Sequence, residues 1–268
     1  MLLASPTETD ERRIPLYRRS GFLRALSPIV LLLVWQIGSS SGWIPAKKLP
    51  APSVVFDAGL ETFQSGQLGD ALLVSGQRAL YGFVLGAVLA LVLGVLAGLS
   101  KIGEYAVDPP LQMIRTIPLF GLIPLFIIWF GIGEEPKVYL IALGVFFPLY
   151  LNTFAGIRQL DPKLLELGSA LQLGLAERLR LLILPGALPQ ILVGVRQSLG
   201  IAWLSLIVAE QINAGAGLGF VVNNAREFLR TDIVVFGLVI YSLLGLATDA
   251  IVRLLERRAL RWRPAVHR

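Results

Sequence analysis

Six long apolar stretches constrain this chain more than any other feature of its sequence. Four of them carry no charged residue and span 25–46, 79–100, 116–133 and 138–157. Each is close to the roughly 20 residues that an α-helix needs to cross the hydrocarbon core of a bilayer. Two further stretches are interrupted by charges: 181–209 contains Arg196, and 233–255 contains Asp249 and Arg253. The pattern predicts an all-α polytopic membrane protein with six transmembrane helices.

Composition supports this fold class. Only 16% of the residues are charged and the mean hydropathy is +0.70, whereas about a quarter of the residues are charged in soluble domains. The first apolar stretch is long and no evident soluble domain follows it, so we expect a retained span rather than a cleaved signal peptide. Small residues at Gly82, Gly86 and 94–98 favour close approach between helices in lipid.

The distribution of lysine and arginine predicts the orientation. With both termini in the cytoplasm and six alternating spans, sixteen of these cations lie in inner segments and five in outer ones, as the positive-inside rule requires. We therefore expect a multi-pass membrane protein with both termini in the cytoplasm. Its parts would be cytoplasmic tails at 1–24 and 256–268, a transmembrane domain at 25–255 and a cytoplasmic loop at 158–185. The net charge of +6 then reflects topology, and no basic patch interleaved with aromatic residues indicates a nucleic-acid partner.

The inner loop before the fifth span has a helical pattern of its own. Asp161 is placed to cap a helix, and Pro162 suits the first helical position. Gly174 offers a break, and Pro185 is expected to close a second short helix. One face of the first helix carries Leu164, Leu167 and Leu171. This face either docks onto another protein or packs on the spans of the chain itself.

The segment from Glu166 to Pro185 resembles the "EAA" loop of ATP-binding-cassette importer permeases. Glu166 takes the glutamate position, and Leu184 and Pro185 fall at the Leu-Pro positions with the family spacing. The chain departs from the pattern in that Leu167 and Gly168 replace two alanines, Leu182 replaces an isoleucine, and Gln172 stands where a glycine is expected. Gly174 lies two residues later, which would shift the helix break.

The resemblance extends over most of the chain beyond its N-terminal tail. Segments 75–83, 123–133, 147–153, 184–189, 194–196, 208–210 and 224–229 are similar to the permease group for nitrate, sulfonates, taurine and bicarbonate, and most of all to aliphatic-sulfonate permeases. This resemblance implies the type I importer permease fold in a bacterial inner membrane, a homodimer, two ATPase subunits on the cytoplasmic face and an external substrate-binding protein. The ATPase-coupling residues that it implies are Leu164, Glu166, Leu167, Leu171, Gly174, Leu184 and Pro185.

The resemblance also implies a non-catalytic chain. ATP and Mg would bind the partner ATPase, and we expect no cofactor, metal site or catalytic residue here, since the only histidine is His267 and the sequence has no cysteine. The expected substrate is a small anion, first of all an aliphatic sulfonate, with taurine, nitrate, bicarbonate or a pyrimidine precursor as alternatives. A stand-alone secondary carrier is a remote alternative, because no inverted repeat is evident.

Charged residues within or beside the spans are candidates for the translocation pathway. Arg196 lies near mid-bilayer and shares a helical face with Trp203 and Glu210. It would serve a passing anion or hold two helices together as a buried ion pair. Arg78 could line the pathway or extend to the headgroups, and Asn224 and Arg226 could line the outer gate or cap a helix. The candidate set is Arg78, Arg196, Trp203, Glu210, Asn224 and Arg226.

Overall fold

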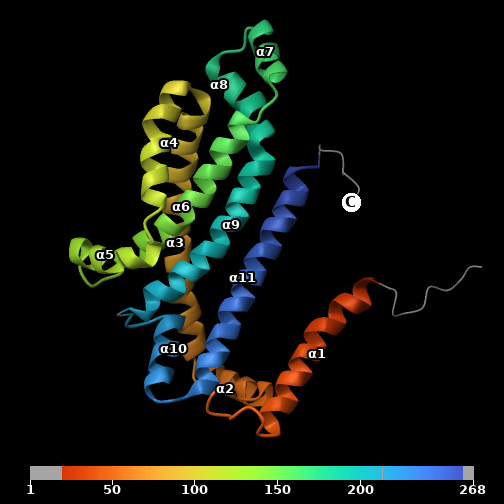
Figure 1. Cartoon of the computed structure of the whole chain (residues 1–268), viewed down its shortest axis with the longest axis vertical. Coiled ribbons are helices and arrows are strands. Elements are labelled where there is room, and N and C mark those ends of the chain that lie inside the picture. The colour runs from red at the N-terminus through yellow and green to blue at the C-terminus, as the bar shows by residue number, and fades with distance from the viewer. Residues whose placement is uncertain (1–19, 213, 262–268) are drawn as a thin grey trace, which may run out of the picture.

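A computed structural model describes residues 20–212 and 214–261, and this part of the chain contains helices and no strand (Figure 1). The N-terminal half consists of α1 (Ser20–Ser40), α2 (Pro52–Gln64), α3 (Gln67–Leu99), α4 (Lys101–Arg115), the short 3₁₀ helix η2 (Leu119–Leu122) and α5 (Ile123–Phe130). The C-terminal half consists of α6 (Glu135–Arg158), α7 (Pro162–Ala170), α8 (Leu175–Arg178), the π-helical turn η3 (Leu179–Ile183), α9 (Leu184–Gln211), α10 (Leu218–Glu227) and α11 (Thr231–Ala259).

The centre of the molecule is α6, which packs between α3 and α9. A methyl group added at Gly82 or Gly98 would come within 3.0 Å of Ile141 or Ile157 on α6, and one at Gly86 would lie 2.3 Å from the Ala142 carbonyl. These glycines therefore let the two helices approach closely, which confirms the interpretation of the small residues.

Four helical stretches are long and apolar enough to cross a membrane: α3, α6, the continuous stretch 175–211 and α11. The pair formed by α4 and 119–130 counts as a fifth if it is one broken span, and the apolar part of α1, Leu26–Ser40, is shorter. Helices in the described residues thus give four or five spans by this test, and the sixth stays a prediction.

The third predicted span, 116–133, is not a straight helix. The preceding segment forms α4, which packs on α3, and 119–130 leaves its axis at 88°. Pro118 explains the break, because a proline disfavours helical geometry at Ile117, the residue before it, and is itself extended here with ψ 119°.

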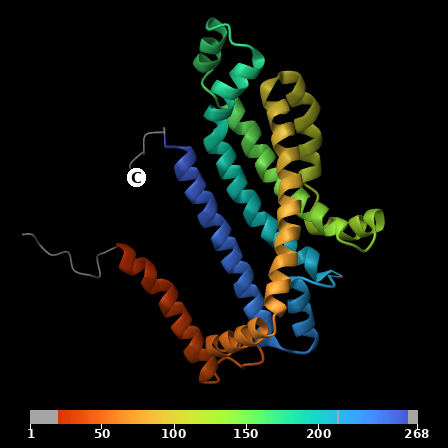
Figure 2. The ribbon, with the colours of Figure 1, turned by 180° about the vertical axis from the view of Figure 1, so that it is seen from behind.

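The elements are arranged with two distinct ends. In Figure 1, α7 and α8 lie at one end of the bundle, and α2 and α10 lie at the other. Figure 2, the reverse view, shows α1 leaving the bundle from its contact with α2. Trp35 Nε1 donates to the Pro50 carbonyl at 3.0 Å, and Ser39 Oγ donates to the Leu49 carbonyl at 2.7 Å, so α1 is fixed at the α2 end.

Candidate functional site

The loop at the first end begins as predicted. The Asp161 side chain accepts a hydrogen bond from the main-chain NH of Lys163 at 2.9 Å, and Pro162 is the first residue of α7. Asp161 thereby satisfies one of the NH groups that a helix leaves unpaired at its start. Both predictions are confirmed.

The break after α7 is not shifted to Gly174. Gln172 has a left-handed backbone (φ 52°), and the NH groups of Gln172 and Leu173 donate to the carbonyls of Ser169 and Gly168 at 3.0 Å each. This is the Schellman pattern of helix termination, in which glycine is the usual left-handed residue. Gly174 instead has φ −66° and starts α8, where the Glu177 carboxylate accepts from its NH at 2.8 Å. The shift was therefore predicted wrongly.

Pro185 does not close a second short helix. The chain continues from α8 through the π-helical turn 179–183 into α9, where Pro185 lies in the first turn. The NH of Leu184 bonds to the Leu179 carbonyl, five residues back. A wider turn of this kind accommodates a proline that lacks an NH and would clash with the carbonyl four residues earlier, so the predicted stop is wrong.

The leucines of α7 are exposed. Leu164, Leu167 and Leu171 are 39%, 49% and 61% accessible, and Glu166 is also exposed. Only the Gly168 side of the helix packs, because a methyl group there would lie 2.8 Å from the Leu182 side chain. The alternative in which the three leucines pack on the spans of the chain is thus contradicted. Gly174 and Leu184 are exposed as well, and Pro185 is half-buried.

An ion-pair network joins five helices near the other end, and its charged side chains are buried except that of Glu134, which is 59% exposed. Arg78 on α3 is 4% exposed and binds Glu134, just before α6, with two nitrogens. Its Nη1 donates to Glu210 on α9 and to the Ala216 carbonyl, both at 2.7 Å. Lys137 Nζ donates to Glu134 at 3.0 Å. Arg78 therefore does not extend to the headgroups.

Glu210 is the centre of this network and is 1% exposed. Its carboxylate accepts from Ser75 Oγ at 2.7 and 2.9 Å and from Tyr241 Oη on α11 at 2.8 Å. It also accepts from the main-chain NH of Gly219 at 2.8 Å, at the positive end of the α10 dipole. Four residues of the network were not among the predicted site residues: Ser75, Glu134, Lys137 and Tyr241. The adjacent charges in 134–137 are the only signal of them in the sequence.

The Arg78 guanidinium holds the pKa of Glu134 down to about 2 through its hydrogen bond, against the opposing effect of burial. Lys137 acts in the same direction. The carboxylate therefore stays ionised at neutral pH and keeps the network charged.

Arg196 lies apart from this network. Its Nε donates to Asp249 on α11 at 2.5 Å, and Arg253 binds the same carboxylate. The Arg196 side chain is 47% exposed and lines a hollow of about 450 Å³ between α9 and α11. Arg196 and Glu210 thus do not share an exposed face. The ion pair joins two helices but is not buried, and the part of Arg196 in a translocation pathway stays a prediction.

The other candidate pathway residues are dispersed. Trp203 Nε1 donates to Thr248 Oγ1 on α11 at 3.1 Å and packs beside the core cluster around Leu206. On α10, Asn224 is half-buried and Arg226 is exposed. The fold does not bring these residues together with Arg196, and their part in a pathway stays a prediction.

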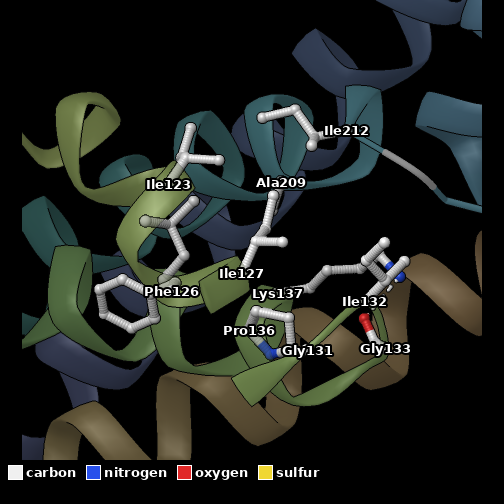
Figure 3. Close-up of a pocket in the computed structure, with 11 residues that line it drawn as sticks. Ile123, Phe126, Ile127, Gly131, Ile132, Gly133, Pro136, Lys137, Ala209 and Ile212 are labelled. Atoms are coloured by element: carbon white, nitrogen blue, oxygen red, sulfur yellow. Dashed lines mark hydrogen bonds between the residues drawn. The ribbon is translucent and has the colours of Figure 1, made fainter. Parts of the chain in front are cut away.

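A small cavity lies where α5 meets α6 and the end of α9. Figure 3 shows its mostly apolar lining, with Ile127 of α5, Pro136 of α6 and Ala209 of α9. Its volume of about 30 Å³ holds no more than a water molecule. The described residues contain no group of His, Asp or Glu side chains able to hold a metal ion.

A protein-family model matches most of the chain. Residues 82–261 match the model of the family described as "Binding-protein-dependent transport system inner membrane component".

Individual proteins are also similar. "Putative aliphatic sulfonates transport permease protein SsuC" of Bacillus subtilis (strain 168) is 46% identical over 94% of this chain and 92% of its own, and the protein of the same name from Escherichia coli (strain K12) is 48% identical over 90% and 91%. "Taurine transport system permease protein TauC" of Escherichia coli (strain K12) is 34% identical over 87% of this chain and 86% of its own.

The fold has a solved counterpart. A chain in the structure "Inward facing conformations of the MetNI methionine ABC transporter: CY5 SeMet soak crystal form" superposes with a TM-score of 0.53 at 19% identity, covering 71% of this chain and 95% of that one. This likeness concerns the fold alone.

Proposed function

The chain belongs to the family of binding-protein-dependent transport system inner membrane components, and on that basis we propose that it is the permease of an ATP-driven importer of aliphatic sulfonates. It would be the membrane-spanning, non-catalytic subunit, and ATP and Mg would bind a separate ATPase. A binding protein outside the inner membrane would deliver the substrate.

The similarity to the two sulfonate permeases is the observation that supports an aliphatic sulfonate as the substrate. Identity of 46% and 48% over at least nine-tenths of both chains is well above the 34% shared with the taurine permease. Taurine is itself a sulfonate, so the same chemical group supports it as the second candidate. Nitrate, bicarbonate and a pyrimidine precursor have no comparable support.

We infer two copies of this chain, two ATPase subunits and one binding protein, with six spans and both termini in the cytoplasm. The exposed end formed by α7 and α8 would then face the ATPase. The broken span and α1 would then supply the two crossings beyond the four long helices.

Helix α7 supports a coupling role for this end. Its exposed leucines and Glu166 form a surface that the chain itself leaves uncovered, and its opposite side packs on the segment that continues into α9. Movement of a docked ATPase would therefore reach a transmembrane helix directly. ATP bound to the ATPase and the loaded binding protein on the opposite face would each shift the equilibrium between the same two conformations of the permease.

The test is transport by the assembled complex. The permease, its ATPase and its binding protein are placed in liposomes, and ATP-dependent uptake of ethanesulfonate, taurine, nitrate and bicarbonate is compared. We expect ethanesulfonate to be taken up fastest and to stimulate ATP hydrolysis. Stimulation by nitrate or bicarbonate alone would reject the sulfonate assignment.

The coupling role has its own test. Glu166→Lys and Leu167→Asp should abolish the stimulation of ATP hydrolysis by loaded binding protein, while the permease still inserts and dimerises. Gln159→Lys is the matched control, because it adds a cation at an exposed position of the same cytoplasmic end. Full stimulation in both loop variants would refute the role.

A further inference from the structure

The broken span forms an elbow at mid-depth. Helix α4 ends at Arg115, and Ile117 and Pro118 are not helical before the chain turns into η2 and α5. Across from this elbow lies Phe147, about midway along α6 and so roughly 17 Å from either end of that helix. Irregular backbone at this depth is found where protein covers it or where it lines a water-filled cavity.

The elbow faces a hollow of about 500 Å³, which we call the elbow hollow. Its walls come from the elbow itself, from α6 and from the middle of α9. Its lining is mostly aliphatic and includes Arg115, Thr116, Phe147 and Gln197. The volume lies within the range of sites for small organic ligands.

Arg115 is the one charged residue of this lining. Within the described residues Arg115 makes no ion pair and its side chain makes no hydrogen bond, whereas the arginines of the long spans α3, α9 and α11 that line or join helices, Arg78, Arg196 and Arg253, each bind a carboxylate. It is exposed, and an uncompensated charge at this depth is expensive in lipid. The negative end of the α4 dipole offsets part of that cost, which leaves the guanidinium free to bind an anion.

Gln197, on the α9 wall, offers a second donor. Gln190 Nε2 donates to Asn152 Oδ1 at 2.7 Å, and Asn152 Nδ2 donates to Gln197 Oε1 at 2.9 Å. The three amides thus form a hydrogen-bonded chain in which each NH₂ group donates to the oxygen of the next amide. The NH₂ group of Gln197, at the end of this chain, has no acceptor among the described residues. Gln197 also lines the hollow beside Arg196, so it is shared by both hollows.

The rest of the elbow hollow is almost entirely apolar. One guanidinium and one amide donor in such a hollow suit an anion that carries a hydrocarbon part. An alkanesulfonate has both features, because its oxygens accept from Arg and amide donors while its chain needs apolar contact. Nitrate and bicarbonate have no hydrocarbon part, and the ammonium of taurine would meet an apolar wall.

We propose that Arg115 and Gln197 form a subsite for the sulfonate group of an alkanesulfonate inside the permease, with the apolar wall of the elbow hollow holding its chain. This inference rests on the proposed function for the identity of the substrate. The site lies at mid-depth and is open, which is consistent with transient binding of the ligand during its passage.

The first test measures the electrostatic potential in the elbow hollow and does not depend on transport. The chain has no cysteine, so Thr116→Cys places a single thiol on the lining, beside Arg115. Its reaction rates with the anionic sulfonatoethyl and the cationic trimethylammonioethyl methanethiosulfonates are compared in the assembled complex. Adding Arg115→Gln should lower the anion-to-cation rate ratio about fivefold or more. An unchanged ratio, or a thiol that neither reagent reaches, overturns the proposal.

The second test measures ethanesulfonate taken up per ATP hydrolysed. Arg115→Gln should lower this quotient about tenfold, the cost of one charged hydrogen bond, and Arg115→Lys should restore part of it. Arg158→Gln is the matched control, since it removes an arginine from the last turn of α6, outside the hollow. If dipole compensation were the whole role of Arg115, both glutamine variants would lower the amount of folded complex and leave the quotient unchanged.

The two proposals fail in different ways. If the wild-type complex takes up no ethanesulfonate but is driven by another anion, the substrate assignment is wrong, and the thiol-reagent ratio still decides whether Arg115 creates an anion site. If ethanesulfonate uptake is normal in both the wild type and Arg115→Gln, the subsite is wrong and the importer stands.

Discussion

At the scale of single residues, the arginines inside the membrane domain differ in what they contact. Arg78 is buried between two carboxylates and fixes helices to one another. Arg196 binds Asp249 yet remains accessible. Arg115 is exposed in an apolar hollow. Because removing one member of a buried pair leaves an uncompensated charge, we expect substitutions of Arg78 to affect folding first and those of Arg115 to affect transport first.

The ion pair of Arg78 with Glu134 predicts a pH dependence of stability. The pKa of Glu134 is lowered from 4.5 to about 2 in the folded protein, so its contribution to stability is complete above pH 4.5 and is lost as the pH falls from 4.5 towards 2. We expect wild type to have a higher Tm than Glu134→Gln at pH 7, and this difference to shrink at pH 3.

Thermal unfolding in lipid nanodiscs measures the Tm of wild type and of Glu134→Gln at pH 7 and at pH 3. Glu135→Gln is the control, because the neighbouring carboxylate makes no ion pair with any described residue. A Tm difference between wild type and Glu134→Gln that is equal at pH 7 and pH 3 would contradict the prediction.

At the scale of elements, close backbone approach and helix termination decide the arrangement. Helix α3 lies against α6 through glycines, and α7 ends at a left-handed residue that is not glycine. The first feature joins two spans rigidly. The second sets the angle at which the exposed helix leaves the loop. Both features therefore position the proposed coupling surface relative to the spans.

Gly86→Ala should destabilise the packing of α3 on α6. The added methyl would lie 2.3 Å from the carbonyl oxygen of Ala142, which is main chain and cannot move without shifting the helix. We expect a loss of about 1–3 kcal/mol in the free energy of unfolding. Gly76→Ala on the same helix is the control, because nothing lies within 4 Å of its added methyl. Equal Tm values for the two variants would refute the packing argument.

Gln172→Gly should stabilise the end of α7. A side chain costs about 1–2 kcal/mol in the left-handed region, and glycine avoids that cost but orders more backbone on folding. We expect a net gain of about 0.5–1 kcal/mol, seen as slower hydrogen exchange at the NH groups of 172 and 173. Gly174→Ala should leave these rates unchanged, since φ −66° suits alanine. Faster exchange in Gln172→Gly would contradict the assignment of the helix end.

At the scale of the whole molecule, the two ends of the bundle are formed by different elements. One end presents the exposed leucines of α7. The other end holds α2 and α10, and there Arg230 binds Glu61 at 2.8 Å, which joins the start of α11 to α2. In the proposed importer, one end would receive an ATPase and the other a binding protein.

Single cysteines test which end faces out, on a chain that has none of its own. We expect a membrane-impermeant reagent added outside to label Gln64→Cys at the end of α2 and not Ser169→Cys on α7. The tail positions Ser5→Cys and Val266→Cys, which lie outside the described residues, should also stay unlabelled. Permeabilised cells give the control for reactivity. Labelling of position 169 from outside would reverse the orientation.

The sequence by itself determined the class of fold, the apolar stretches and the start of α7. These depend on local properties: hydropathy over about 20 residues, the cap at Asp161 and the proline after it. It also carried the resemblance that the family match and the sulfonate relatives bear out.

Only the tertiary structure decided which charges meet. Glu210 binds Ser75 and Arg78, which lie 135 and 132 positions away in the sequence. Gln197 of α9 lines the same hollow as Arg115 of α4. The same holds for Gln172, whose left-handed backbone overrides the local preference for a break at Gly174. Contacts between distant residues depend on how helices pack, and neither periodicity nor spacing along the chain encodes that packing.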